Sequence, residues 1–168
     1  MIDSKLTFER AHELLRIDHD EGQAYWRRRV KRVNEGDRAG TLASNGYWHI
    51  TIDQETYRAH RLFWFMTYGE WPDGFIDHIN MNILDNRICN LRVVTNGENM
   101  QNRRSARKDN KSTGLLGAYP TKDGKKFRAS IMAGKKQFHI GTYCTKEEAH
   151  EAYLKAKIIY HPTAPRLI

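Results

Sequence analysis

The chain has 168 residues, of which 39% are apolar, and its formal net charge is +8. No stretch approaches the roughly 18 uninterrupted apolar residues of a membrane-spanning helix, so the sequence excludes a membrane-embedded protein. A chain of this length can form one ordinary domain or two small ones, and we expect two.

The start of the chain and its cysteines indicate the compartment. The first residues lack the apolar stretch and the small-residue cleavage site of a secretion signal. Cys89 and Cys144 lie far apart, outside any zinc-binding spacing. We therefore expect a protein of the reducing cytoplasm.

The positive charge is confined to the C-terminal part. Residues 103–168 contain 15 Lys and Arg against 5 Asp and Glu, a net charge of +10, whereas residues 1–102 contain 13 against 15, a net charge of −2. A basic region favours a polyanionic partner, because neutralised phosphates release counterions and so drive association irrespective of sequence. The alternative is a basic surface that serves solubility.

The spacing of apolar residues predicts a helix and then a β section at the start of the chain. Residues 4–16 place leucines and an alanine near helical spacing, with Asp3 or Ser4 as the cap. Residues 18–30 form a polar turn that leads into a strand. Residues 39–57 contain a Ser-Asn-Gly turn followed by an alternating run, which predicts a hairpin.

A second helix and then a unit with the order strand, loop, strand, helix follow. Residues 61–68 are apolar nearly all round and end before Gly69, which suits a buried helix. Residues 75–79 and 91–94 are strand-like and flank a polar loop over residues 80–90. A threonine and a glutamate three positions later then form a capping-box pattern, so a helix should begin directly after that threonine.

The last third of the chain has a different pattern. Residues 115–119, 127–132 and 137–143 are strand-like runs separated by turns, which predicts a three-stranded antiparallel sheet. Thr145 and Glu148 form a second capping box. Alanines at helical spacing beyond it would let the following helix lie close against the sheet.

Four side chains of the strand–loop–strand–helix unit have a spacing that can close a site. Asp77 and His78 end the first strand. Asn90 ends the loop, and Asn99 lies in the helix. Folding the helix back would bring Asn99 beside Asp77, giving a carboxylate and an amide oxygen to a divalent cation. This sparse oxygen set suits Mg²⁺, with Mn²⁺ as the alternative, and His78 would take a proton from an attacking water.

Four motifs in this region follow the pattern of a known family. They are AHRL at 59–62, DHIN at 77–80, LDNRICNLR at 84–92 and ENMQN at 98–102. Residues 57–104 thereby resemble the HNH nuclease family, also called the ββα-metal fold, and in particular its phage homing endonucleases.

The resemblance implies a role for each residue of the site. Asp77 and Asn99 correspond to the metal ligands, His78 to the general base, and Asn90 to the residue that fixes the loop so that the base points at the metal. The family name has a histidine where this chain has Asn99. The homing branch commonly has asparagine there, and we expect the neutral amide to hold the metal less tightly.

Each of these residues also has a simpler interpretation. Asp77 could cap a turn, Asn90 could be a left-handed turn residue, and Asn99 could be a surface helix residue. Their combination at these spacings favours the nuclease.

Four neighbouring residues are left out of the catalytic set. His60 lies at the start of an apolar helix, where a histidine is more often a hydrogen-bonded core residue than a catalyst. The role of Arg61 is likewise undecided from the sequence. Arg87 and Arg92 could contact phosphate or pair with Asp85.

The C-terminal part carries a second resemblance. GAY at 117–119, FRASI at 127–131 and HIGTYCTKEEAHEAY at 139–153 are similar to the Apetala-type DNA-binding domain of plant ethylene-response factors, which is also found joined to phage HNH nucleases. The resemblance covers residues 112–162. It implies that the three-stranded sheet enters the major groove while the helix packs behind it.

Strand periodicity assigns one face of this sheet to the core and the other to DNA. The core face carries Phe127, Ala129, Ile131, Phe138 and Ile140. The opposite face, the turns and the preceding basic segment supply the expected DNA-binding residues: Tyr119, Lys122, Lys126, Arg128, Ser130, Lys136, Gln137, His139, Arg103 and Arg104. Tyr119 stands where plant members usually have a base-reading arginine. Arg128 could contact guanine or phosphate, and the lysines could hold phosphates or only solvate their turns.

The expected fold class is α+β, with an N-terminal ββα-metal HNH unit flanked by further strands and helices, and a C-terminal three-stranded antiparallel sheet packed on one helix. We predict an HNH nuclease domain over residues 1–104 with its core at 57–104, a basic linker over 105–113, and an Apetala-type domain over 114–168.

The predicted function is that of a sequence-directed, divalent-metal-dependent DNA endonuclease of the HNH homing type. Its partner would be double-stranded DNA, with no membrane and no small-molecule cofactor, and a monomer that nicks is the simplest case. If a phage encodes it, it would act in the host cytoplasm. Two alternatives are a DNA-binding regulator that retains the HNH fold without turnover and a less specific DNA-degrading nuclease.

Overall fold

The computed structural model describes residues 5–102, 106, 110 and 112–161. The chain divides into two compact units, Met1–Val94 and Thr95–Ile168. The expected linker at 105–113 lies largely outside the described residues, so the predicted domain boundaries stay a prediction. Small antiparallel sheets and helices occur in both units, which confirms the α+β class at this level.

The first unit begins with a short helix and a two-stranded sheet. Helix α1 spans Phe8–Leu14, strand β1 spans Leu15–Asp18 and strand β2 spans Gln23–Trp26. The side chain of Thr7 caps α1, accepting a 3.1 Å hydrogen bond from the backbone N–H of Arg10. The prediction of a helix over residues 4–16 was therefore too long. The helix ends because Leu15 adopts an extended backbone and begins β1.

A three-stranded sheet and the buried helix form the rest of the core of this unit. Strands β3 (Thr41–Leu42), β4 (Trp48–Ile52) and β5 (Glu55–Arg58) pair antiparallel, and helix α2 spans Ala59–Tyr68. Ile50, Leu62 and Phe63 are almost fully buried between them. Gly69 ends α2 in the left-handed conformation, with φ of 81°, as the sequence predicted.

A hairpin completes the first unit and carries the predicted site. Strands β6 (Phe75–His78) and β7 (Leu91–Val94) pair antiparallel, with Asp77 opposite Arg92 and His78 opposite Leu91. The loop between them ends in a 3₁₀ turn, η1, over Ile88–Asn90. Both strands lie within a residue of their predicted ranges.

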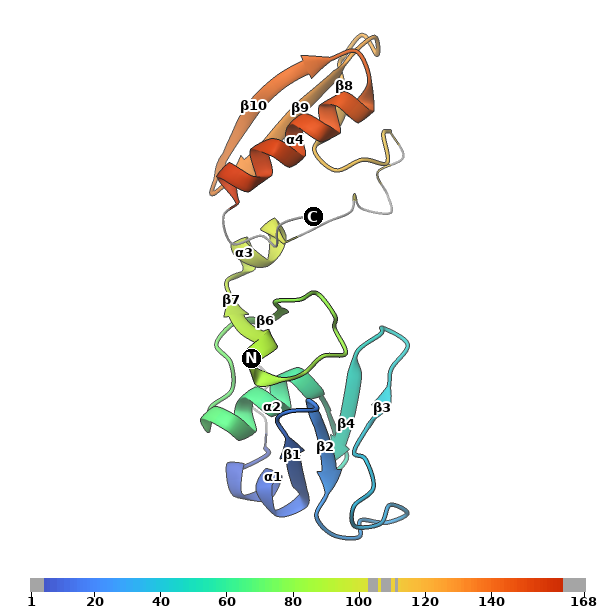
Figure 1. Cartoon of the computed structure of the whole chain (residues 1–168), viewed down its shortest axis with the longest axis vertical. Coiled ribbons are helices and arrows are strands. Elements are labelled where there is room, and N and C mark those ends of the chain that lie inside the picture. Colours follow the sequence, from blue (N-terminus) through green and yellow to red (C-terminus); the bar gives the residue numbers. More distant parts are fainter. Residues whose placement is uncertain (1–4, 103–105, 107–109, 111, 162–168) are drawn as a thin grey trace. The chain divides into compact units, whose positions relative to one another are not determined.

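The second unit consists of a short helix, a three-stranded sheet and a long helix. Helix α3 (Asn96–Gln101) begins at the predicted capping box. Strands β8 (Ala118–Pro120), β9 (Phe127–Ala133) and β10 (Lys136–Tyr143) form a sheet in the order β10-β9-β8, and helix α4 (Lys146–Tyr160) packs against all three strands (Figure 1). The first strand begins three residues later than predicted.

One glycine and several alanines explain how closely α4 approaches the sheet. Ala118, Ala129 and Ala149 are fully buried between sheet and helix. Gly117 has φ of +76°, and a Cβ atom there would lie 2.1 Å from the Tyr153 ring. Only glycine satisfies both conditions. Phe138 lies on the core face but is 36% exposed, because it packs over Tyr160 at the open edge of this face.

The described helices are all too short or too polar to span a lipid bilayer.

Candidate active site and DNA-contact face

His78 is held in place at the buried end of strand β6. Its side chain is 4% exposed, and its ring Nε2 lies 3.2 Å from Oδ1 of Asn86, a buried residue of the following loop. Because Oδ1 only accepts, this contact requires the proton to sit on Nε2. In the neutral form of the ring, Nδ1 is then the nitrogen with the lone pair.

Asn90 ties the two ends of the loop together. Its Oδ1 accepts a 2.8 Å hydrogen bond from the backbone N–H of Asn80, and its Nδ2 donates at 2.8 Å to the carbonyl of Asp85. Its own carbonyl accepts from the N–H of Ile79 at 2.8 Å. A single buried side chain therefore fixes the backbone on both sides of the loop that follows His78.

Asp85 fixes the tip of the same loop. Its carboxylate accepts from Nε and Nη2 of Arg87 at 2.8 and 2.7 Å and from Nδ2 of Asn80 at 2.6 Å. The hydrogen bond from Arg87 is the main reason that the pKa of Asp85 is lowered to about 2. Arg87 thus pairs with Asp85, one of the two possibilities that the sequence left open.

Asp77 forms an ion pair across the hairpin. Nε and Nη2 of Arg92 donate to its Oδ2 at 2.9 and 2.7 Å. The Asp77 side chain is 15% exposed and that of Arg92 32% exposed. The pairing follows from the strand register, which places the two residues opposite each other. The Asp77 carboxylate therefore lies directly beside a guanidinium.

His60, on helix α2, packs against the His78 ring. The two ring centroids lie 5.3 Å apart in an edge-on arrangement, and Tyr47 contacts His60 at 5.3 Å. His60 is 4% exposed, and its pKa is lowered to about 3, first by burial and then by the proximity of His78. It is therefore a neutral core residue at physiological pH.

Arg61 fastens the segment that leads into β6. Its Nη1 donates at 2.7 Å to the carbonyl of Gly74, and its Nη2 donates at 3.2 Å to that of Pro72. Burial lowers the pKa of this guanidinium. The AHRL motif thus supplies one residue that packs on His78 and one that anchors the strand ending in His78.

Asn99 belongs to the second unit. It is an exposed residue of α3, a helix with no buried residue among those described. Asp77 and His78 belong to the first unit. The pairing of Asp77 with Asn99 as metal ligands therefore stays a prediction. Among the described residues, no group of three His, Cys, Asp or Glu side chains converges as a metal site.

The segment that contains these residues is similar to a known protein family. Residues 57–101 match the HNH endonuclease family. At the level of the family, this match supports a nuclease that acts on DNA. Comparison with curated proteins found no match, and comparison with solved structures found none either.

The HNH segment, residues 57–101, includes all four residues that we predicted for the site. The structure brings three of them, Asp77, His78 and Asn90, together at the base of one hairpin. Sequence reasoning missed Asn86. Its only signal was its place in an asparagine-rich loop, and no spacing rule connects it to His78.

The face of the C-terminal sheet turned away from α4 carries most of the predicted DNA-binding residues. Tyr119 and Arg128 are paired across strands β8 and β9, and the Arg128 guanidinium lies 5.7 Å from the centroid of the Tyr119 ring. Both are exposed, as is His139 on β10. Ser130 is opposite His139 but is only 6% exposed.

Ser130 is therefore less accessible than its strand position suggested. Its hydroxyl accepts a 3.0 Å hydrogen bond from the Gln137 side chain, which lies over it. Gln137 itself is exposed. A partner on this face would meet the glutamine first.

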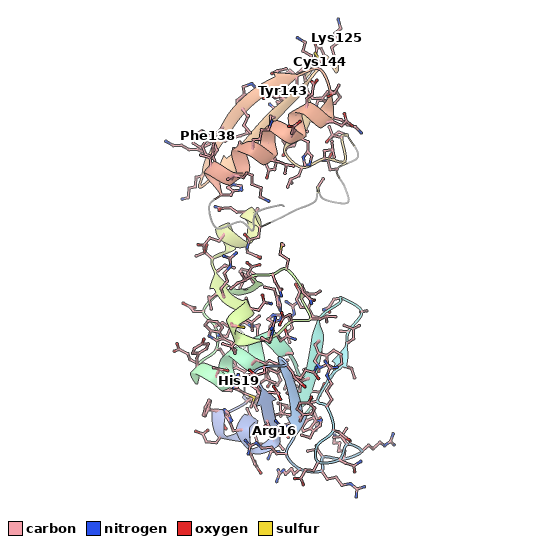
Figure 2. All side chains as sticks on the ribbon, viewed as in Figure 1. Arg16, His19, Lys125, Phe138, Tyr143 and Cys144 are labelled. Atoms are coloured by element: carbon pink, nitrogen blue, oxygen red, sulfur yellow. The ribbon has the colours of Figure 1, made fainter. Side chains whose placement is uncertain are left out.

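The lysines of the turns are exposed at the ends of the sheet. Lys122 and Lys126 flank the β8–β9 turn, at whose tip Figure 2 shows Lys125, and Lys136 begins β10. The acidic residue of that turn, Asp123, has its pKa lowered, mainly by a hydrogen bond from Thr121. Arg103 and Arg104 lie outside the described residues.

Proposed function

We propose that this chain is a sequence-directed, divalent-metal-dependent DNA endonuclease of the HNH homing type. The observation that carries the proposal is that His78 and the loop after it are held in place by hydrogen bonds. His78 ends a strand of the HNH segment, its Nε2 is bound by Asn86, and the loop beyond it is fixed by Asn90. A nuclease base needs a fixed imidazole with one nitrogen ready to accept a proton.

In the proposed reaction, His78 removes a proton from the water that attacks the scissile phosphate. The hydrogen bond from Nε2–H to Asn86 holds the ring in one tautomer, so Nδ1 receives the proton. Asn90 keeps the loop, and with it Asn86, in a fixed position relative to the ring. This follows the roles that the resemblance implied and adds Asn86 to them.

The oxygen ligands Asp77 and Asn99 suit a hard cation, Mg²⁺ or Mn²⁺. Nε and Nη2 of Arg92 donate to Oδ2 of Asp77 at 2.9 and 2.7 Å, and Asp77 would offer its carboxylate to the cation. The bound cation would stabilise negative charge on the scissile phosphate and on the leaving 3′-oxygen. We propose no further ligand from this chain.

The C-terminal sheet is proposed to hold the DNA duplex. The exposed pair Tyr119–Arg128, on the face opposite α4, and the exposed lysines of the turns offer aromatic and cationic groups to a duplex. Arginine can read guanine edges or hold phosphates, and lysines hold phosphates. The likeness to the Apetala-type domain supports placing this face in the major groove.

One observation favours the alternative of a DNA-binding regulator. Arg92 already balances the charge of Asp77, as in a site that no longer uses a metal. The two proposals differ in turnover, so cleavage assays separate them.

The decisive experiment maps cleavage of phage genomic DNA by the full chain with Mg²⁺, with Mn²⁺ and with a chelator. Loss of the general base in His78→Ala should lower the single-turnover rate by about 10²- to 10⁴-fold. His19→Ala, at an exposed histidine of the same unit (Figure 2), is the matched control and should cleave like the wild type.

Unchanged cleavage by His78→Ala would refute the assigned base. Cleavage that persists in the chelator would refute metal dependence. A wild-type chain that binds DNA and never cuts it would favour the regulator.

A further inference from the structure

The loop that connects β2 to β3 in the first unit concentrates positive charge, although residues 1–102 as a whole have a net charge of −2. Its cations are Arg27, Arg28, Arg29, Lys31, Arg32 and Arg38, and its carboxylates are Glu35 and Asp37. All eight side chains belong to exposed residues. The balance favours contact with an anion.

Half of these cations have a structural role. Arg28 forms a 2.8 Å ion pair with Glu13, and Arg27 donates from Nε to the carbonyl of Leu15 at 3.0 Å. Arg38 stacks over the Trp48 ring at 3.9 Å. The other three, Arg29, Lys31 and Arg32, form no ion pair with any residue that the structure describes. We name these three the basic hairpin tip.

The backbone projects the basic hairpin tip into solvent. Val30 and Val33 form a bridge with two reciprocal backbone hydrogen bonds of 3.1 and 3.0 Å, so Lys31 and Arg32 are the two central residues of a tight turn. Lys31 has φ of +52°, a conformation that favours glycine. A lysine in this position costs backbone strain that glycine would avoid.

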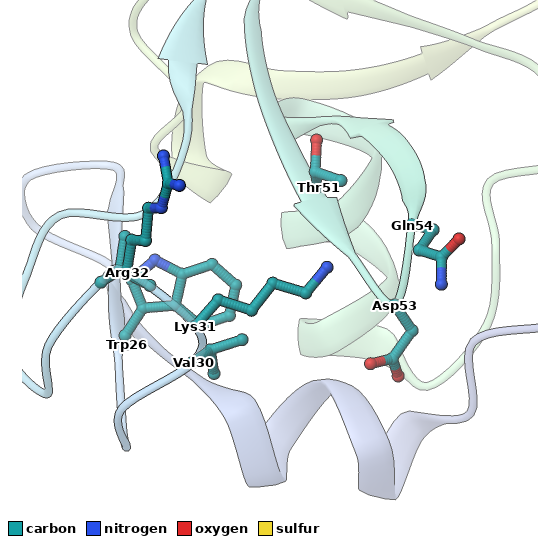
Figure 3. Close-up of a pocket in the computed structure, with 8 residues that line it drawn as sticks. Trp26, Val30, Lys31, Arg32, Thr51, Asp53 and Gln54 are labelled. Carbon is teal, nitrogen blue, oxygen red and sulfur yellow. The ribbon is translucent and has the colours of Figure 1, made fainter.

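Asp53, a carboxylate that shares a hollow with the tip, already has a partner. The turn borders a hollow of about 410 Å³ whose lining also includes Trp26 and Asp53. Figure 3 shows Lys31 extending across this hollow, which Arg32 also lines. Asp53 is held by Arg10, whose Nε and Nη2 donate to it at 2.8 and 2.9 Å. Its charge is therefore already balanced.

We propose that the basic hairpin tip contacts the phosphate backbone of DNA, as a second contact surface separate from the C-terminal sheet. This inference rests on the proposed function, in which DNA is the substrate. In Figure 1 the β2–β3 loop lies at the opposite end of the first unit from β6 and β7. The tip therefore contacts phosphates away from the bond that is cut, and it contributes to affinity and not to the chemical step.

The test uses the full chain, a labelled duplex of arbitrary sequence and no divalent metal. Each phosphate contact contributes about 0.9 to the slope of log affinity against log salt. The triple variant Arg29→Ala, Lys31→Ala, Arg32→Ala should therefore lower that slope by about 3 and weaken binding most at low salt.

A charge-matched control separates the tip from net charge. Lys5→Ala, Arg16→Ala, Arg28→Ala removes three exposed cations of the same unit, two of which are ion-paired. This control should change the slope far less. Equal slopes for the two triple variants, or a wild-type slope in the tip variant, would overturn the proposal.

A single substitution separates binding from folding. Lys31→Gly removes the cation and suits the positive φ, so its unfolding midpoint should equal or exceed that of the wild type while its DNA affinity falls. Wild-type affinity in this variant and in the triple variant would contradict the inference while leaving the proposed endonuclease intact.

The cleavage assay distinguishes the two proposals. A tip variant that cuts at the wild-type rate when enzyme saturates the DNA supports both. Binding through the tip in a chain that never cuts DNA would refute the endonuclease and retain the contact. A wild-type chain that binds no duplex would refute both.

Discussion

At the scale of the residue, one weak hydrogen bond sets the orientation of the His78 imidazole. A single neutral hydrogen bond contributes only about 1 kcal/mol to net stability. The one from His78 to Asn86 nevertheless selects which ring nitrogen carries the proton. Asn86 should therefore matter more to the reaction than to folding.

Replacing Asn86 tests this positioning role. Asn86→Ala should lower the single-turnover cleavage rate by roughly 10- to 100-fold, as the loss of an orienting partner does at comparable sites, with DNA affinity unchanged. Asn86→Asp keeps an acceptor for Nε2–H and should retain more activity. The added negative charge would favour the imidazolium, so the pH–rate profile should move to higher pH.

Asn82→Ala is the control for these variants, because Asn82 is an exposed asparagine of the same loop whose Oδ1 accepts from the Leu84 N–H at 3.1 Å. It should preserve the pH–rate profile. If Asn86→Asp shows the wild-type profile, Asn86 has only a structural role.

At the scale of elements, helix α2 contacts strand β6 and the segment that leads into it. Its buried face carries His60 against the His78 ring, and Arg61 anchors the backbone that leads into β6. A histidine that the folded core keeps neutral lowers stability wherever the unfolded chain takes up a proton at the same residue. Because burial lowers the pKa of His60 to about 3, this effect depends on pH.

The sign of that dependence follows from linkage. The folded pKa of His60 lies below its ordinary value of 6.5, so the unfolded chain binds the proton first as pH falls. This loss of stability is absent above pH 6.5 and grows progressively as pH falls from 6.5 to about 3. The free energy of unfolding should fall by about 1 kcal/mol per pH unit in this window.

His60→Phe should flatten this part of the stability curve, which urea denaturation at several pH values measures. The substitution keeps an aromatic ring against Tyr47 and His78. His19→Gln, at an exposed position, should keep the wild-type slope. A His60→Phe curve as steep as that of the wild type would show that other groups cause the pH dependence.

At the scale of the whole molecule, the two units differ in charge and in their share of the HNH segment. The HNH segment lies mainly in the first, and most of the positive charge lies in the second. Deleting residues 112–168 should therefore weaken DNA binding, reduce its salt dependence and broaden site choice. Cleavage at saturating enzyme should remain.

Mapped cut sites and salt titrations of the truncated and full-length chains measure these effects. Loss of all cleavage in a truncated chain that remains folded by circular dichroism would contradict this division of roles.

Local patterns determined most of the elements. Capping boxes at Thr95 and Thr145 fixed the starts of two helices, and Gly69 fixed the end of a third, because these signals act through hydrogen bonds and backbone angles of nearby residues. Strand-like runs of apolar and polar residues located β6, β7 and the three strands of the C-terminal sheet within a few residues. The sequence alone also predicted Asp77, His78 and Asn90 as site residues, and the structure places them near one another at one end of the β6–β7 hairpin.

Only the tertiary structure decided which partners surround these residues. It gave His78 the loop residue Asn86, paired Asp77 with Arg92 and buried Ser130 beneath Gln137. It also left Arg29, Lys31 and Arg32 exposed at the tip of a strained turn. Such contacts depend on strand register and on loop closure, which join positions that no periodic pattern connects, whereas capping and alternation are properties of neighbouring residues.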